Sequence, residues 1–176
     1  IIQSELDAAA ETARDEGVKI NLLKQDLRNF VSQKKYDCAV NLYTSFGYCE
    51  NEQDDFKILK NIYNALNPGG IFILESVSRE TAIINFTEGE EFFRSDIKVI
   101  TNFSVSGAWE GLCSAWTLVF PDGKRIEHKF VQRLYSASEL KKDLLKIGYK
   151  SVEIYGGYEK QPYNQTAATM VLVCKK

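Results

Sequence analysis

The chain has 176 residues, of which 44% are hydrophobic and 26% are charged, and its formal net charge at pH 7 is −2. This length suits one domain that buries a sizeable core. The weakly acidic balance provides no basic field for nucleic acid or for an anionic membrane, so we expect neither as a partner. No apolar run approaches the ~18 residues of a membrane-spanning helix.

The cysteines and the single histidine show no pattern typical of a metal site. None of the cysteines stands at Cys-x-x-Cys spacing, and His128 is the only histidine, so we expect no bound metal. Reduced thiols in a cytoplasmic protein are the plainer interpretation of Cys38, Cys49, Cys113 and Cys174. The absence of a signal-peptide pattern also favours a cytoplasmic location.

In the first half of the chain, segments with helical spacing alternate with short apolar runs. Ser4 is a candidate helix cap and Gly17 a stop signal, while Pro68 and the glycines after it interrupt the next periodic segment. The expected elements are a helix over 4–16, strands over 18–23 and 36–43, a helix over 55–66 and a strand over 71–75. This alternation predicts an α/β fold with a parallel, doubly wound sheet.

The second half changes character. Residues 76–133 contain runs that alternate with period two, and Pro121–Lys124 is typical of a hairpin turn, so we predict an antiparallel meander there. A helix over 136–147, capped by Ser136 or Ser138 and stopped by Gly148, comes next. Two final strands are expected over 151–155 and 170–174.

Four stretches in this order resemble the class I S-adenosylmethionine-dependent methyltransferases, in particular the small bacterial enzymes that act on small molecules. They are Gln25–Arg28, Lys35–Tyr48, Leu59–Glu75 and Leu134–Leu140. The resemblance implies a Rossmann-like sheet that is mostly parallel, with an antiparallel last strand. It makes residues 1–176 one methyltransferase domain, with residues 77–133 as an antiparallel insertion that forms a lid or substrate subdomain.

The family's glycine-rich Gly-x-Gly-x-Gly loop is absent, as is the acidic residue that ends the strand after it. By spacing, that acid would stand one or two positions before Ile1. We therefore expect the domain to be incomplete at its N-terminus, lacking the first strand and the glycine-rich loop.

The resemblance also implies residues that bind S-adenosylmethionine, whose product is S-adenosylhomocysteine. The Asp26 carboxylate would accept from the adenine amino group, and the Leu27 backbone N–H would donate to a ring nitrogen. The Asn41 backbone carbonyl would meet the ammonium group, while Leu42 and Phe46 would wall the adenosine or the sulfonium. The alternative for Asp26 is a helix cap, and for Leu42 and Phe46 it is plain core.

Tyr43, Thr44 and Tyr48 follow the 36–43 strand and would face the methyl acceptor. The Tyr43 hydroxyl is a candidate for orienting an amine or hydroxyl nucleophile, which makes Tyr43 one of two candidate catalytic residues. Simple packing is the alternative, above all for Tyr48.

Aromatic and cationic residues of the 77–133 segment and its end are the candidates to line the lid. Arg133 would pair with a carboxylate or phosphate of the acceptor, with Tyr135 beside it. His128, the second catalytic candidate, has the one side chain whose ordinary pKa lies near neutrality. A surface charge for Arg133 and a structural role for His128 are the alternatives. Trp109 and Trp116 complete this set.

The function implied is methyl transfer from S-adenosylmethionine to a small-molecule N or O nucleophile by in-line displacement, by a monomer or a homodimer. A non-catalytic protein that keeps the fold for binding or regulation is the alternative. A nicotinamide dehydrogenase is disfavoured by the expected antiparallel last strand and by the Asp26–Arg28 segment. A nucleic-acid methyltransferase is disfavoured by the acidic balance.

Overall fold

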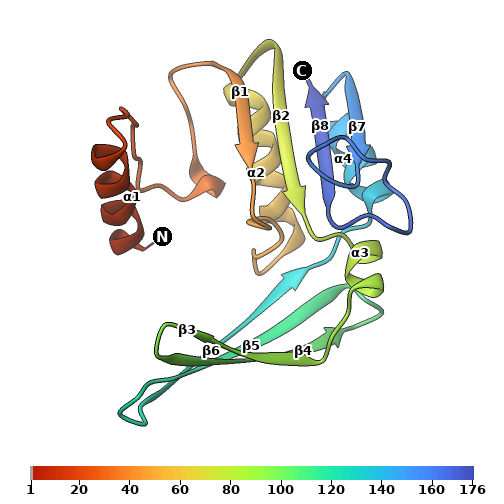
Figure 1. Ribbon diagram of the computed structural model, residues 1–176. Helices are drawn as coiled ribbons and strands as arrows, with labels where there is room; N and C mark the ends of the chain where they lie inside the picture. Colours follow the sequence, from red (N-terminus) through yellow and green to blue (C-terminus); the bar gives the residue numbers. More distant parts are fainter. Residues whose placement is uncertain (1) are drawn as a thin grey trace.

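Two four-stranded sheets are the main architecture of the computed structural model, which describes residues 2–176 (Figure 1). The helices are α1 (Gln3–Asp15), the 3₁₀ turn η1 (Leu27–Asn29), α2 (Glu52–Ala65), α3 (Arg79–Ile84) and α4 (Ala137–Ile147). The strands are β1 (Tyr36–Asn41), β2 (Leu66–Ser76), β3 (Gly89–Arg94), β4 (Ile97–Ser106), β5 (Gly111–Val119), β6 (Arg125–Arg133), β7 (Ser151–Tyr155) and β8 (Met170–Lys175). Within the described residues, no helix is long and apolar enough to cross a membrane.

The first sheet has the strand order β1-β2-β8-β7. Strand β1 runs parallel to β2, and β8 runs antiparallel to both of its neighbours. The expected antiparallel last strand is therefore confirmed. Because β8 is antiparallel to both β2 and β7, these two strands point the same way, and β1 points with them. The carboxyl ends of β1, β2 and β7 therefore lie at the same edge of the sheet.

One face of this sheet carries the core. Phe72 and Leu74 of β2 point to the face on which α2 and α4 pack, and both are fully buried. Burial of each such side chain stabilises the fold by about 1.5–3 kcal/mol. Helix α4 begins with a capping box between Ser136 and Glu139, so Ser136 and not Ser138 is its cap.

The opposite face of the sheet is open within the described residues. Val40 of β1 is 59% exposed and Ile71 of β2 is 39% exposed, and α1 lies apart from β1 and β2 (Figure 1). The expected strand over 18–23 is wrong: these residues are irregular. A strand needs a partner for its backbone groups, and β1 pairs here with β2 alone.

Some expected boundaries also move. Helix α1 begins at Gln3, after Ile2, so Ser4 lies inside it and does not cap it. Helix α2 begins at Glu52, three residues earlier than expected, because the Asn51 side chain accepts from the Asp54 N–H and caps it. The Asn67–Gly70 turn is extended enough to join β2.

The second sheet has the order β3-β4-β5-β6, and every neighbouring pair is antiparallel. It confirms the expected antiparallel meander over residues 89–133, whereas the first part of the 76–133 segment contains helix α3 instead of a strand. Its β5–β6 hairpin closes at Gly123, which has φ +82° and donates its N–H to the Phe120 carbonyl at 2.9 Å. Helix α3 connects β2 to this sheet, which lies beyond the carboxyl ends of β1 and β2 (Figure 1).

Candidate active site

The carboxyl ends of β1 and β2 meet at one edge of the first sheet, where ligands of open α/β sheets bind. Asn41, the last residue of β1, pairs with Leu74 of β2, and Glu75 follows on the next position. The loop after β1, residues 42–51, therefore starts beside Glu75. Most of the expected cofactor and acceptor residues lie on this loop or next to it.

The first turn of this loop has an unusual backbone. Tyr43 and Thr44 have φ values of 54° and 56°, a left-handed conformation that is rare for a β-branched residue. The Thr44 N–H donates to Glu75 Oε2 at 3.0 Å, and Thr169 Oγ1 donates to Glu75 Oε1 at 2.6 Å. The Tyr43 side chain is 88% exposed, so it projects away from the core.

Asn41 has an unfilled hydrogen-bonding position. Its side-chain Oδ1 is buried and has no partner among the described residues. A buried acceptor without a donor is costly, so the atom is suited to meet a donor of a ligand. Leu42 beside it is half-buried. Phe46 is 2% exposed and packs on Tyr135 with ring centroids 5.5 Å apart, so the structure places Phe46 in the core.

Asp26 lies in a turn and not at a strand end. Its carboxylate caps η1 by accepting the Arg28 N–H at 2.9 Å, and it accepts the Arg28 guanidinium as well. These bonds hold the pKa of Asp26 down at about 2. Asn61 of α2 donates to the Leu27 carbonyl at 2.9 Å and so fixes the turn against α2. The capping alternative is thus realised, and Arg28 donates to both oxygens of the partly exposed carboxylate.

Arg133 and Tyr135 both point to Asp55, which is completely buried. The Arg133 guanidinium forms an ion pair with the Asp55 carboxylate and donates to the Cys49 carbonyl at 3.2 Å. The Tyr135 hydroxyl donates to the same Asp55 oxygen at 2.9 Å. Burial and the nearby carboxylate raise the pKa of Tyr135. These two residues therefore connect the 42–51 loop to the end of β6, and their contact with an acceptor stays a prediction.

The remaining lid candidates divide between two places. Trp116 and His128 are paired across β5 and β6, so they point to the same face of the second sheet. The His128 ring lies 5.6 Å from that of Phe130, which is 5.8 Å from Tyr48. The Trp116 Nε1 is buried and has no partner among residues 2–176. Trp109 instead packs edge-on against Phe86, at 5.4 Å.

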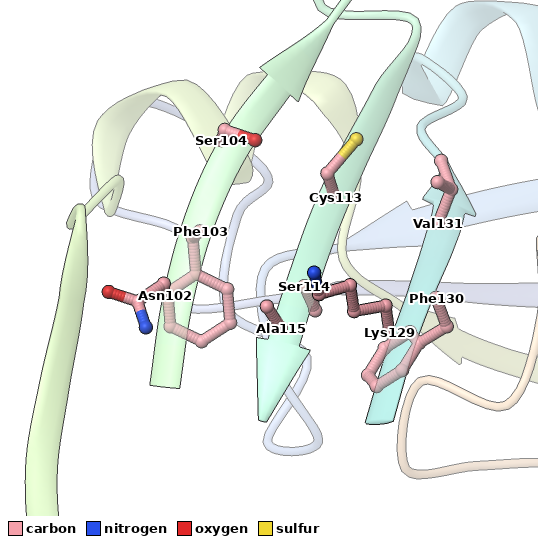
Figure 2. Close-up of a pocket in the computed structure, with 9 residues that line it drawn as sticks. All are labelled: Asn102, Phe103, Ser104, Cys113, Ser114, Ala115, Lys129, Phe130 and Val131. Atoms are coloured by element: carbon pink, nitrogen blue, oxygen red, sulfur yellow. The ribbon is translucent and has the colours of Figure 1, made fainter. Parts of the chain in front are cut away.

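The second sheet and its surroundings contain two apolar cavities. The larger, of about 450 Å³, is lined by residues of β4, β5 and β6 (Figure 2). The smaller, of about 260 Å³, lies between α3, the sheet residues Phe103 and Leu112, and Ala168. Phe103 lines both, so the cavities share a wall. Two residues of the smaller cavity stand close in sequence to the Glu75–Thr169 contact: Val77 follows Glu75 by two positions, and Ala168 precedes Thr169.

Three residues of this region were not expected from the sequence: Asp55, Glu75 and Thr169. A signal existed for Glu75, since an acidic residue at the carboxyl end of a buried strand stands where ligands bind. Asp55 offered none, because its partner Arg133 is 78 residues away and only the fold brings the two together.

The chain thus has an α/β fold with the candidate site at the carboxyl ends of its parallel strands. No family model matches the chain. It is 31% identical over 78 residues to a ubiquinone biosynthesis O-methyltransferase of Rickettsia canadensis (strain McKiel). That match covers 44% of this chain and 31% of the relative, so the chain spans about a third of the relative's length.

Solved structures identify the fold more fully. An S-adenosylmethionine-dependent methyltransferase from Clostridium acetobutylicum ATCC 824 superposes with a TM-score of 0.83 at 20% identity, covering 99% of this chain and 72% of that one. The CcbJ methyltransferase from Streptomyces caelestis gives a TM-score of 0.72 at 12% identity, covering 85% and 61% respectively. The chain therefore has the fold of the class I S-adenosylmethionine-dependent methyltransferases.

Proposed function

We propose that this protein transfers a methyl group from S-adenosylmethionine to the nitrogen or oxygen of a small-molecule acceptor. The observation that carries the proposal is the methyltransferase fold combined with an unsatisfied buried acceptor, Asn41 Oδ1, at the carboxyl end of β1. The similarity to an O-methyltransferase and to the sugar N-methyltransferase KedS8 supports both kinds of nucleophile. KedS8 superposes with a TM-score of 0.67 at 13% identity.

The residues at this edge suit the cofactor. S-adenosylmethionine, when bound, supplies a sulfonium methyl that is already a strong electrophile, so the protein mainly binds, orients and excludes water. Asn41 would present its backbone carbonyl and its free Oδ1 to the amino-acid end. The partly exposed Asp26 carboxylate would accept from the adenine amino group, and the Leu27 N–H would donate to a ring nitrogen. Leu42 would pack against the adenosine.

The acceptor side is formed by Tyr43, Thr44 and Tyr48 on the loop and by residues 77–133, to which we assign the role of a lid. The cavity between α3 and the lid has a volume of about 260 Å³ and a mostly apolar lining. This volume is below the roughly 300–1,000 Å³ typical of sites for drug-sized ligands. It suits an acceptor with a single ring, whose amine or hydroxyl we propose to face Tyr43.

The test has two stages, both with the full-length protein. Isothermal titration with S-adenosylhomocysteine should show saturable binding, and the Asp26→Ala variant should bind about tenfold more weakly, the effect of losing about 1.4 kcal/mol. Next, S-adenosylhomocysteine release would be followed by mass spectrometry with catechol, 3,4-dihydroxybenzoate and 3-amino-3-deoxy-D-glucose as acceptors. Binding without turnover on any acceptor would favour a non-catalytic role, and no binding would refute the proposal.

A further inference from the structure

Glu75 has a buried carboxylate at the candidate site, yet the proposed transfer gives it no role. The residue is 7% exposed. Each of its carboxylate oxygens accepts one hydrogen bond, from the Thr44 N–H at 3.0 Å and from the Thr169 hydroxyl at 2.6 Å. The donors belong to the loop after β1 and to the residue before β8. Glu75 thus connects three separate segments at one point.

The bond to Thr44 stabilises a strained turn. Both Tyr43 and Thr44 adopt left-handed φ values that non-glycine residues rarely take, and such a backbone persists only where neighbours determine it. The Tyr43 side chain is too exposed to be held by packing. The Ser45 hydroxyl donates to the Leu42 carbonyl at 2.6 Å and closes the turn from within. The Glu75 carboxylate is the contact that fixes the turn to the sheet.

A tyrosine hydroxyl lies near the Glu75 carboxylate. The Tyr158 hydroxyl lies near both Glu75 and Tyr43, and desolvation together with these two groups raises the pKa of Tyr158. Val77 and Ala168, each one or two residues from Glu75 or Thr169, line the small apolar cavity.

We infer that Glu75 is a positioning residue, whose carboxylate holds the left-handed Tyr43–Thr44 turn and so fixes the direction in which the Tyr43 hydroxyl meets the acceptor. The inference rests on the proposed function. In this account the Glu75 carboxylate exchanges no proton: one of its oxygens accepts from the turn and the other from Thr169. Its effect on methyl transfer passes through the geometry of Tyr43.

Two substitutions separate positioning from chemistry. In Glu75→Gln the amide oxygen still accepts from the Thr44 N–H, while the amide nitrogen donates to the Thr169 hydroxyl, so the turn is kept and only the charge is lost. Glu75→Ala removes both bonds. We expect Glu75→Ala to lower kcat by about 10–100-fold, the usual effect of a misplaced group, with the KM for S-adenosylmethionine within about twofold. Glu75→Gln should stay within about threefold of the wild type.

A double-mutant cycle with Tyr43→Phe gives a readout that a merely structural role would not change. If Glu75 acts through Tyr43, Glu75→Ala should lower kcat by no more than about twofold in the Tyr43→Phe background. The assay measures S-adenosylhomocysteine release with the best acceptor of the panel above. In parallel, ¹⁵N NMR should show a downfield Thr44 amide proton that moves upfield in Glu75→Ala and stays in Glu75→Gln.

Each failure has its own meaning. An inactive wild type would refute the proposed function. With an active wild type, equal losses in Glu75→Gln and Glu75→Ala would show that the carboxylate itself reacts and would overturn the inference. An unchanged kcat or additive losses in the cycle would overturn it as well. If Glu75→Ala does not fold, Thr169→Val takes its place with Thr169→Ser as control, since only the serine keeps the second anchor.

Discussion

Replacing Asp55 by asparagine tests the network that joins the 42–51 loop to the end of β6. The side chain is fully buried and accepts from Arg133, from the Tyr135 hydroxyl and, at 3.3 Å, from the Cys49 N–H. Asparagine keeps the shape, so no cavity forms, but it turns an amide nitrogen toward donors and leaves the Arg133 charge unpaired. Removing one partner of a buried ion pair costs about 3–5 kcal/mol.

Water reduces this cost, because the Arg133 side chain is 25% exposed. We therefore expect Asp55→Asn to lose about 2–3 kcal/mol of the free energy of unfolding, which lowers Tm by roughly 4–12 °C for a chain of this size. Urea unfolding followed by circular dichroism would measure it. Asp143→Asn is the matched control, since it removes an exposed pair with Lys146 that is worth about 0–0.5 kcal/mol.

The test compares the free energies of unfolding of Asp55→Asn and Asp143→Asn. If the free energy of unfolding of Asp55→Asn lies within about 0.5 kcal/mol of that of Asp143→Asn, the buried network does not stabilise the junction and the reasoning is refuted. A double variant with Arg133→Gln should lose less than the sum of the single losses, because the unpaired charge is gone.

Three further outcomes follow from the structure. Iodoacetamide at pH 8 should label exposed Cys38 first and Cys174 only on unfolding, because burial raises the pKa of the Cys174 thiol to about 12. Early labelling of Cys174 in mass spectra would contradict its buried position. Gly47→Ala should lose about 1–3 kcal/mol in urea unfolding, since its Cβ would lie 2.5 Å from a carbonyl oxygen at the end of β6, whereas Gly17→Ala, with open space around it, should lose less. The Glu139 pKa lies below its ordinary 4.5, chiefly because a backbone N–H of the capping box donates to the carboxylate. The ionised carboxylate therefore stabilises the folded protein above about pH 4.5, and this stabilisation is lost as the pH falls. The Tm difference between wild type and Glu139→Gln should change between pH 6 and pH 3, and a constant difference would count against the cap.

The fold was predictable where local pattern and pairing agree. Strand β2 and helix α4 follow directly from an apolar run and from a capped periodic segment ended by Gly148. The 18–23 run is also rich in apolar residues but has no partner strand among the described residues, so it stays irregular. Sequence pattern reports how readily a segment forms a strand, whereas pairing depends on what lies beside it.

The candidate site was predictable only in part. The loop after β1 was found because it follows an apolar, strand-like run, and Tyr43, Thr44 and Tyr48 do lie there. The partners of Asp55 and Glu75 were not, because those contacts join segments 78 and 94 residues apart. No periodicity or spacing encodes such pairs.

Titration of the full-length protein with S-adenosylmethionine by calorimetry tests the central claim most directly. The account predicts one binding site per chain, saturable and competed by S-adenosylhomocysteine, with heat that is weakened in Asp26→Ala. A folded protein that gives no heat with either molecule at millimolar concentration would contradict the account.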